Sequence, residues 1–222
     1  MVDRKMRPLR LQLSDVAAAH LRDQITSGNL VAGAPVRPEV VADELGISTT
    51  PAREALQALR AEGFLDLAPR RGFTVAKLDG NDIRDMFLVQ SQVSGELASR
   101  ATEKATPEVI ERLEEIHAAL IEAANAGDLE RLEELNHQFH REINLAAAAP
   151  RLAQVIRLAS RYAPSRFYAS IPGWPETTVN DHQTLLDAIR NGDAELARSE
   201  MTQHVHVAGE QLASYIDSRI SA

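Results

Sequence analysis

The fold of this 222-residue chain is decided by the stretch Ile47-Ser48-Thr49-Thr50-Pro51-Ala52-Arg53-Glu54-Ala55-Leu56-Gln57-Ala58-Leu59-Arg60-Ala61-Glu62-Gly63-Phe64. It opens with three hydroxyl residues and a proline, a pattern typical of a helix N-terminus. Ala55, Leu56 and Leu59 recur at the spacing of one helical turn and predict a buried stripe. Gly63 ends the helix. The stretch therefore predicts a helix whose polar N-terminus and arginines face solvent.

The neighbouring segments extend this helix into a small domain. Pro38–Leu45 predicts a shorter helix, and Gly46 supplies a tight turn between the two. Apolar segments at 64–67 and 73–76 predict two strands, joined by a tip at 69–72 that carries Arg70 and Arg71. A helix, a glycine turn, a second helix and a basic hairpin together predict a winged helix-turn-helix.

A further helix is predicted before this motif, at residues 14–26. Val16, Leu21 and Ile25 are expected on its inner face. The glycines and prolines that follow, around residues 28–35, predict a loop.

Charge is distributed unevenly along the chain. The net charge is −8, but residues 1–78 hold 11 Lys and Arg against 9 Asp and Glu, and the remainder holds 13 against 23. A mildly basic N-terminal part followed by an acidic remainder is typical of a DNA-binding module joined to a domain that does not contact DNA. There is no cysteine, and no apolar run approaches the ~20 residues of a membrane span. These features predict a cytoplasmic protein.

Residues 79–222 are expected to form a second domain made only of helices. The polar junction 78–82 separates it from residues 1–78. Glycines that end helices and residues that cap helix starts divide it into six helices, which predict an antiparallel bundle. The predicted helices span residues 83–104, 106–126, 128–147, 151–162, 178–191 and 194–217. A loop is predicted at residues 171–175.

Four residues of this bundle form a possible metal site. Asn136 and His140 leave one face of the third helix, His182 is expected in the first turn of the fifth, and His204 in the middle of the last. One amide oxygen and three imidazoles would suit zinc, nickel or manganese. Spacing alone also allows the simpler interpretation that each histidine is solvated or paired locally. The remaining bundle histidines, at 117, 137 and 206, are expected at the surface or facing elsewhere.

Residues 9–78 resemble the DNA-binding domain of the GntR family of bacterial transcription regulators. The resemblance rests on Ser48–Leu56, on Glu62-Gly63 and on Gly72. Residues 83–217 resemble the FCD ligand-binding domain of the FadR subfamily, through the motifs at 136–140, 182–189 and 201–204. This resemblance implies that Asn136, His140, His182 and His204 hold a divalent metal ion.

Two positions depart from the pattern of the family. Thr49 stands where the family usually has an arginine that reads bases, and Gln90 stands where it often has an arginine that clamps a carboxylate. Gln90 and Arg161 are therefore the candidates for effector binding. Arg157 is a further substitute, although a solvated helix face explains either arginine better.

The resulting hypothesis is a transcription regulator, not an enzyme. A homodimer would place two recognition helices on a palindromic operator, and a small organic acid bound near the metal would control operator affinity. The residues expected to contact DNA are Arg37, Ser48, Thr49, Thr50, Arg53, Arg70, Arg71 and Gly72. The alternatives are a pure metal sensor, a helical metalloenzyme and an architectural DNA-binding protein.

Overall fold

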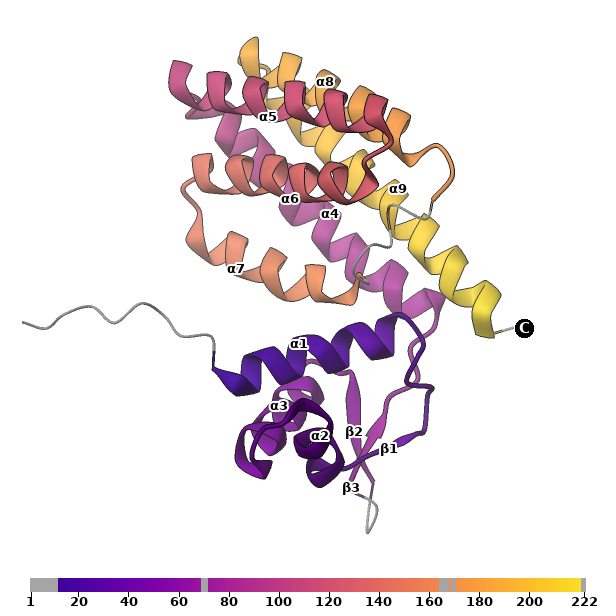
Figure 1. Ribbon diagram of the computed structural model, residues 1–222. Coiled ribbons are helices and arrows are strands. Elements are labelled where there is room, and N and C mark those ends of the chain that lie inside the picture. Colours follow the sequence, from indigo (N-terminus) through magenta and orange to yellow (C-terminus); the bar gives the residue numbers. More distant parts are fainter. Residues whose placement is uncertain (1–11, 69–71, 164–167, 169–170, 221–222) are drawn as a thin grey trace, which may run out of the picture. The chain divides into compact units, whose positions relative to one another are not determined.

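The computed structural model describes residues 12–68, 72–163, 168 and 171–220 (Figure 1). The chain divides between Leu78 and Asp79 into two compact units. None of the helices in these ranges is both long enough and apolar enough to cross a membrane.

The first unit is a winged helix-turn-helix. Its elements are α1 (Leu13–Thr26), β1 (Pro35–Val36), α2 (Pro38–Leu45), α3 (Thr49–Ala61), β2 (Leu65–Ala68) and β3 (Gly72–Val75). Gly46 adopts the left-handed conformation, φ 62°, that turns α2 into α3. Leu56 and Leu59 of α3 are fully buried, and Arg22 of α1 donates to Glu62 just after α3 at 2.7 Å. These contacts fix α3 against α1.

Two details of this unit differ from the sequence prediction. Residues 35–36 form a third strand rather than loop, because Val36 is buried and pairs with Phe73 in an antiparallel sheet of order β1-β3-β2. Val16 is 49% exposed, because it lies about 200° around the helix from Ala18. The inner face of α1 is formed instead by Ala17, Ala18, Leu21 and Ile25.

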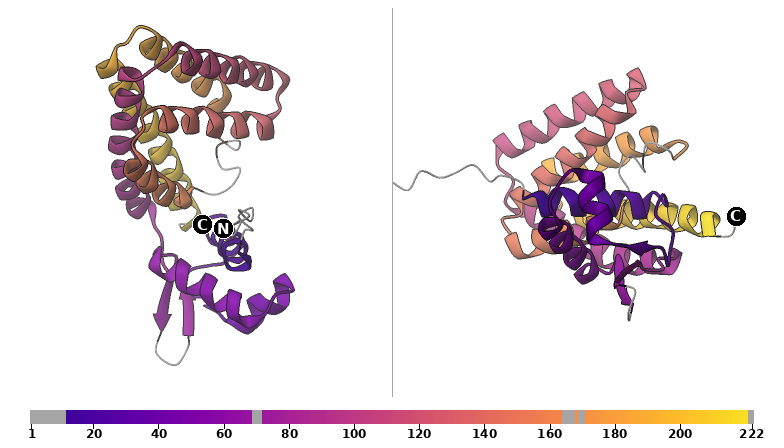
Figure 2. Two further views of the ribbon diagram at one scale, coloured as in Figure 1. Left: turned by 90° about the vertical axis from the view of Figure 1, so that its left-hand side faces the viewer. Right: turned by 60° about the horizontal axis from the view of Figure 1, so that its bottom comes forward.

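The second unit is an all-helical bundle. It comprises α4 (Gly80–Glu103), α5 (Pro107–Ala126), α6 (Leu129–Ala146), α7 (Pro150–Ala159), the 3-10 turn η1 (Ser160–Tyr162), α8 (Trp174–Arg190) and α9 (Ala194–Ile220). The long helices α4 and α9 run antiparallel side by side, as Figures 1 and 2 show. Their ends are joined where the Gly80 amide donates to Asp217 Oδ1 at 2.9 Å. The predicted fold class is confirmed.

Helix α8 begins four residues earlier than the sequence prediction of residue 178. The sequence predicts a loop at Pro175, but proline is well tolerated in the first turn of a helix. Trp174 starts α8 and is buried in the core. The earlier start moves His182 from the predicted first turn into the third turn.

Glycines allow α4 and α9 to approach closely. A Cβ on Gly95 would lie 2.8 Å from the backbone carbonyl of Arg198, and a Cβ on Gly209 would overlap the Cβ of Phe87. Phe87 is itself 1% exposed, so it has no room to move aside. This packing depends on the absence of a side chain at both positions.

We expect Gly209→Ala to lower the free energy of unfolding by about 1–3 kcal/mol, because overpacking outweighs the gain in helix propensity. Urea denaturation of the full chain measures it. Ser214→Ala, at an exposed position of the same helix, is the control and should change stability by less than about 0.5 kcal/mol. Equal effects of the two substitutions would contradict this account of the α4–α9 contact.

Candidate metal centre and nucleic-acid interface

Three histidines from three helices converge inside the second unit. His140 comes from α6, His182 from α8 and His204 from α9. The centroids of their rings are 5.1 to 5.2 Å apart in all three pairs, and one nitrogen of each lies within 4.8 Å of the others. Ligands on a single ion with bonds of 2.0–2.1 Å would lie roughly 3–3.5 Å apart. Small side-chain rotations would therefore bring the three nitrogens to one centre.

His182 is the most constrained of the three. It is 0% exposed and stacks on Phe139, with ring centroids 4.2 Å apart. Neither of its ring nitrogens has a hydrogen-bond partner among the described residues. Asn136, one turn before His140 on α6, is 7% exposed, and its Oδ1 likewise has no partner in that part of the chain. Buried polar atoms are normally paired, so Asn136 and His182 are the candidates in this site for binding an ion.

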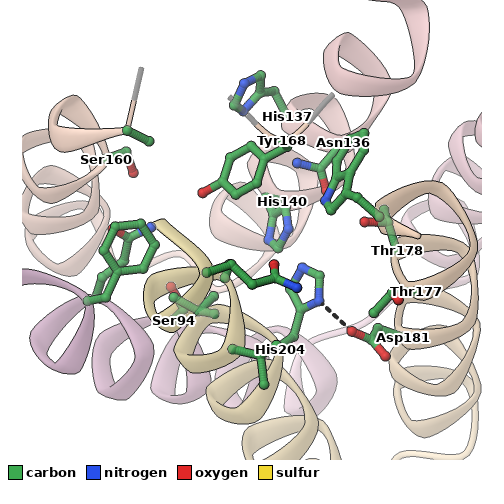
Figure 3. A pocket seen from close by; sticks show the side chains of 18 of the residues that line it. Ser94, Asn136, His137, His140, Ser160, Tyr168, Thr177, Thr178, Asp181 and His204 are labelled. Atoms are coloured by element: carbon green, nitrogen blue, oxygen red, sulfur yellow. Dashed lines mark hydrogen bonds and ion pairs between the residues drawn. The ribbon is translucent and has the colours of Figure 1, made fainter. Parts of the chain in front are cut away.

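Asp181 orients the third histidine. Its Oδ2 lies 2.8 Å from Nδ1 of His204. Figure 3 marks this contact with a dashed line. A carboxylate that accepts the Nδ1 proton leaves Nε2 as the nitrogen with a lone pair. The sequence interpretation did not single out Asp181, although it adjoins His182. Asp181 also adds a carboxylate next to the amide and imidazole ligands that the sequence predicts.

Burial keeps the other two imidazoles neutral. Desolvation, with smaller contributions from the neighbouring histidines, holds the pKa of His140 and of His182 well below the ordinary value of 6.5. Neutral imidazole is the form that binds metal ions. Below a pH of about 6.5 the unfolded chain takes up protons at these positions and the folded chain does not. Without a bound ion, the stability of this unit therefore falls as the pH falls through that range.

A cavity of about 120 Å³ lies beside the three histidines. Its wall includes His140, His204 and the proposed effector residue Gln90, whose Oε1 is buried and has no partner among the residues described. Arg161, in η1, is not among the described lining residues, but its neighbour Ser160 is. Other lining side chains are Ser94, His137, Tyr168, Thr177 and Thr178 (Figure 3).

One of the remaining histidines differs from the prediction. His137 is exposed, as expected, although it also borders the cavity (Figure 3). His117 is 3% exposed rather than superficial, and its Nε2 lies 3.1 Å from Gln183 Oε1. Helical spacing locates a residue on its own helix, but it does not predict which neighbouring helix covers that face.

The predicted DNA-contacting residues of α3 share one exposed face. Thr49, Thr50 and Arg53 border a shallow surface depression together with Glu54 and Gln57. Gln57 follows Arg53 by four residues, and its amide suits base recognition. The sequence interpretation had not included it, although the i, i+4 spacing could have identified it.

The other candidates for DNA contact that the structure describes lie at the ends of helices and strands. Arg37 is exposed at the N-cap of α2, and Ser48 is the exposed N-cap of α3, where its side chain makes no capping hydrogen bond. Gly72 begins β3 with φ 74°. Arg70 and Arg71 lie outside the described residues.

Family models match both units. Residues 13–75 match the gntR family of bacterial regulatory proteins, and residues 85–207 match the FCD domain. The second match alone spans more than half of the chain. Both relate this protein to transcription regulators, and not to enzymes.

Individual relatives agree with this assignment. The chain is 29% identical over 182 residues to the HTH-type transcriptional regulator McbR of Escherichia coli, covering 80% of this chain and 82% of McbR. It is 30% identical over 196 residues to a "probable D-xylose utilization operon transcriptional repressor" of Paenarthrobacter nicotinovorans, covering 85% of each. The solved structure of E. coli McbR/YncC superposes with a TM-score of 0.70 at 26% identity, over 91% of this chain and 99% of that one. The protein belongs to the GntR family of DNA-binding transcription regulators and carries an FCD domain.

Proposed function

We propose that this protein is a repressor of the FadR subfamily that binds a palindromic operator as a homodimer in the cytoplasm. A small organic acid, bound at a divalent ion in the FCD domain, would release it from DNA. The observation that carries the proposal is His182, fully buried between His140 and His204 with no partner for either nitrogen among the residues described.

The ion would be held by Asn136, His140, His182 and His204. One metal ion would accept a lone pair from the buried Asn136 Oδ1 and another from one of the two buried His182 nitrogens, none of which has a partner among the described residues. Nitrogen and oxygen ligands without sulfur suit zinc, nickel or manganese. Asp181 would act through His204, fixing its tautomer and its orientation.

The adjoining cavity favours an organic effector over a pure metal sensor. With four protein ligands, an ion of coordination number five or six keeps open positions. Asp181 offsets only part of the charge of a divalent ion, so an anionic oxygen in the cavity would be attracted to it. In a pure metal sensor the ion alone would order the bundle, and the cavity would have no ligand to hold.

DNA binding would follow the geometry of paired helix-turn-helix proteins. A homodimer presents two copies of α3 to successive major grooves, roughly 34 Å apart. Effector binding that changes operator affinity roughly 5–150-fold corresponds to a coupling of about 1–3 kcal/mol. The sign of regulation, repression, is taken from the D-xylose operon relative named as a repressor.

Several exposed apolar side chains support a homodimer. They lie on α4, at the end of α6 and on α7: Leu88, Val89, Leu145, Val155 and Leu158. Helices α4 and α7 pack against each other. Exposed apolar residues on neighbouring helices are candidates for a protein interface.

We expect purified protein to contain about one divalent ion per chain, and a carboxylate effector to raise its melting temperature only while the ion is present. Elemental analysis and thermal shift with and without a chelator measure both.

Asp181→Asn should weaken metal affinity by about 10–100-fold, because carboxylates that hydrogen-bond to ligating histidines contribute that much. Glu176→Gln, an acidic residue in the first turn of the same helix, is the control. A carboxylate that stabilises the chelated protein equally well would argue against coordination to the ion.

We expect Arg53→Ala to weaken operator binding by about 1–3 kcal/mol, because Arg53 lies on the exposed face of α3. Arg60→Ala, an exposed arginine in the last turn of α3, is the matched control. Fluorescence anisotropy over a salt series on a selected operator distinguishes the type of contact. A lost phosphate contact reduces the salt slope by about one, and a lost base contact relaxes specificity. Equal losses for both variants would contradict the proposed DNA-contacting face.

We expect Leu158→Lys to shift the protein from dimer toward monomer, because a charge would replace an apolar contact in the proposed interface. Light scattering after size exclusion measures the mass. Leu196→Lys, at an exposed leucine of α9, should remain dimeric. A wild-type chain that is monomeric at micromolar concentration would contradict the proposed homodimer.

A further inference from the structure

The described part of the α3 face expected to meet DNA carries more acidic than basic side chains. Arg53 is the one cation among the described residues that border its surface depression, and Glu54 beside it is an acid. Glu39, in the first turn of α2, lies against the same arginine. Thr49 stands where the family usually has a second arginine. These residues together therefore offer little attraction to phosphate, which is the main source of sequence-independent affinity for DNA.

Glu39 and Arg53 form an ion pair between the two helices of the helix-turn-helix. Nη2 of Arg53 lies 3.7 Å from Oε1 of Glu39. This separation is longer than the roughly 2.7–3.2 Å of an N–H···O hydrogen bond, so the guanidinium keeps its N–H groups for another acceptor. The two side chains are 60% and 65% exposed, so DNA can reach the pair.

A carboxylate beside this guanidinium affects the two kinds of DNA contact differently. Guanine presents the uncharged acceptors O6 and N7, which one arginine binds with two N–H groups. A phosphate group is an anion, so a carboxylate at this distance from the arginine repels it. An arginine that is already paired also releases fewer counterions when it meets phosphate. Glu39 therefore weakens contact of Arg53 with phosphate more than contact with a base.

The ion pair also restricts the orientation of the arginine. A long side chain on a helix surface has many rotamers, and a partner on the neighbouring helix reduces their number. Fewer rotamers in the free protein leave less entropy to lose when the guanidinium binds a base edge with two hydrogen bonds. We propose that Glu39 is a specificity-determining residue, which positions Arg53 for guanine and disfavours its contact with phosphate. This inference rests on the proposed contact of Arg53 with DNA.

The simpler interpretation of Glu39 is structural. An acidic residue in the first turn of a helix interacts favourably with the positive end of the helix dipole, so Glu39 would only stabilise α2. Its removal would then weaken binding to every DNA sequence alike. The proposed role predicts the opposite result for unrelated DNA, to which binding becomes tighter.

The test uses the full-length protein and Glu39→Gln, which removes the charge and keeps the size of the side chain. Fluorescence anisotropy over a salt series compares an operator selected from a random library by the wild-type chain with a duplex of unrelated sequence. We expect the variant to bind the unrelated duplex roughly 2–5-fold more tightly, the size of effect that an exposed ion pair produces, and with a steeper salt dependence. Affinity for the operator should stay about the same, so the ratio of the two affinities falls by that factor.

Two further variants serve as controls. Glu44→Gln removes the same charge from an exposed position of α2 about 140° around the helix from Glu39. It should leave the ratio of the two affinities unchanged. When Arg53→Ala is already present, Glu39→Gln should also leave the ratio unchanged, because its effect passes through the arginine. Circular dichroism and thermal melting establish that each variant is folded.

The outcomes separate this inference from the proposed DNA contact. An unchanged ratio in Glu39→Gln, an equal fall in Glu44→Gln, or a fall that persists with Arg53→Ala would overturn the role of Glu39. So would equal weakening of both duplexes, the result of a structural role. Each of these results leaves the contact of Arg53 with DNA standing if Arg53→Ala alone weakens operator binding. Operator binding that is unchanged in Arg53→Ala would overturn the contact and this inference together.

Discussion

The burial of one imidazole is the constraint on which the helical domain depends. His182 has no exposed surface, stacks on Phe139 and faces His140 and His204, yet its nitrogens are unpaired among the described residues. An unsatisfied buried polar atom costs about 1–3 kcal/mol, and a protonated imidazole there would cost more. Helices α6, α8 and α9 must nevertheless meet at this point. An ion that accepted a lone pair from each of the three histidines would join these three helices. It would also offset the cost of burying the imidazoles, because metal binding contributes directly to folding free energy.

The same helix that carries His204 also forms the longest packing contact of this unit. Gly95 and Gly209 let α9 lie close against α4, and Asp217 near its end accepts from the Gly80 amide at the start of α4. Helix α4 follows β3 of the winged unit after only residues 76–79. A displacement of α9 at the cavity would be transmitted to α4, because close-packed helices transmit small shifts rather than absorb them. Helix α4 is the element of this unit that the short linker joins to the winged unit.

Sequence reasoning located what local patterns determine. The stripe of Leu56 and Leu59, the turn at Gly46 and the proline that starts α5 depend on neighbours within a few residues, and the structure has them as expected. Sequence reasoning failed where contacts with distant parts of the chain determine the local structure. Val36 became a strand only because Phe73 pairs with it, Trp174 extended α8 because the core buries its ring, and His117 was covered by α8 through Gln183. The convergence of three histidine-bearing helices could be anticipated from family motifs, whereas the Asp181–His204 contact could not, because an acidic residue on a helix carries no periodic signal.

The polar wall of the cavity connects stability with regulation. Gln90 and Thr178 keep buried oxygens without described partners, a cost that an apolar pair of similar shape would avoid. A valine at position 178 would suit the unliganded core at least as well as threonine does. Retaining the hydroxyl makes physical sense if a ligand completes it, because the free energy recovered on binding is then available only in the liganded state. A ligand shifts the equilibrium between two conformations only by the difference in its affinity for them. Free energy that is recovered only in the liganded state supplies such a difference. The unsatisfied groups that weaken the empty bundle are thus the same groups that would allow a small molecule to control DNA binding.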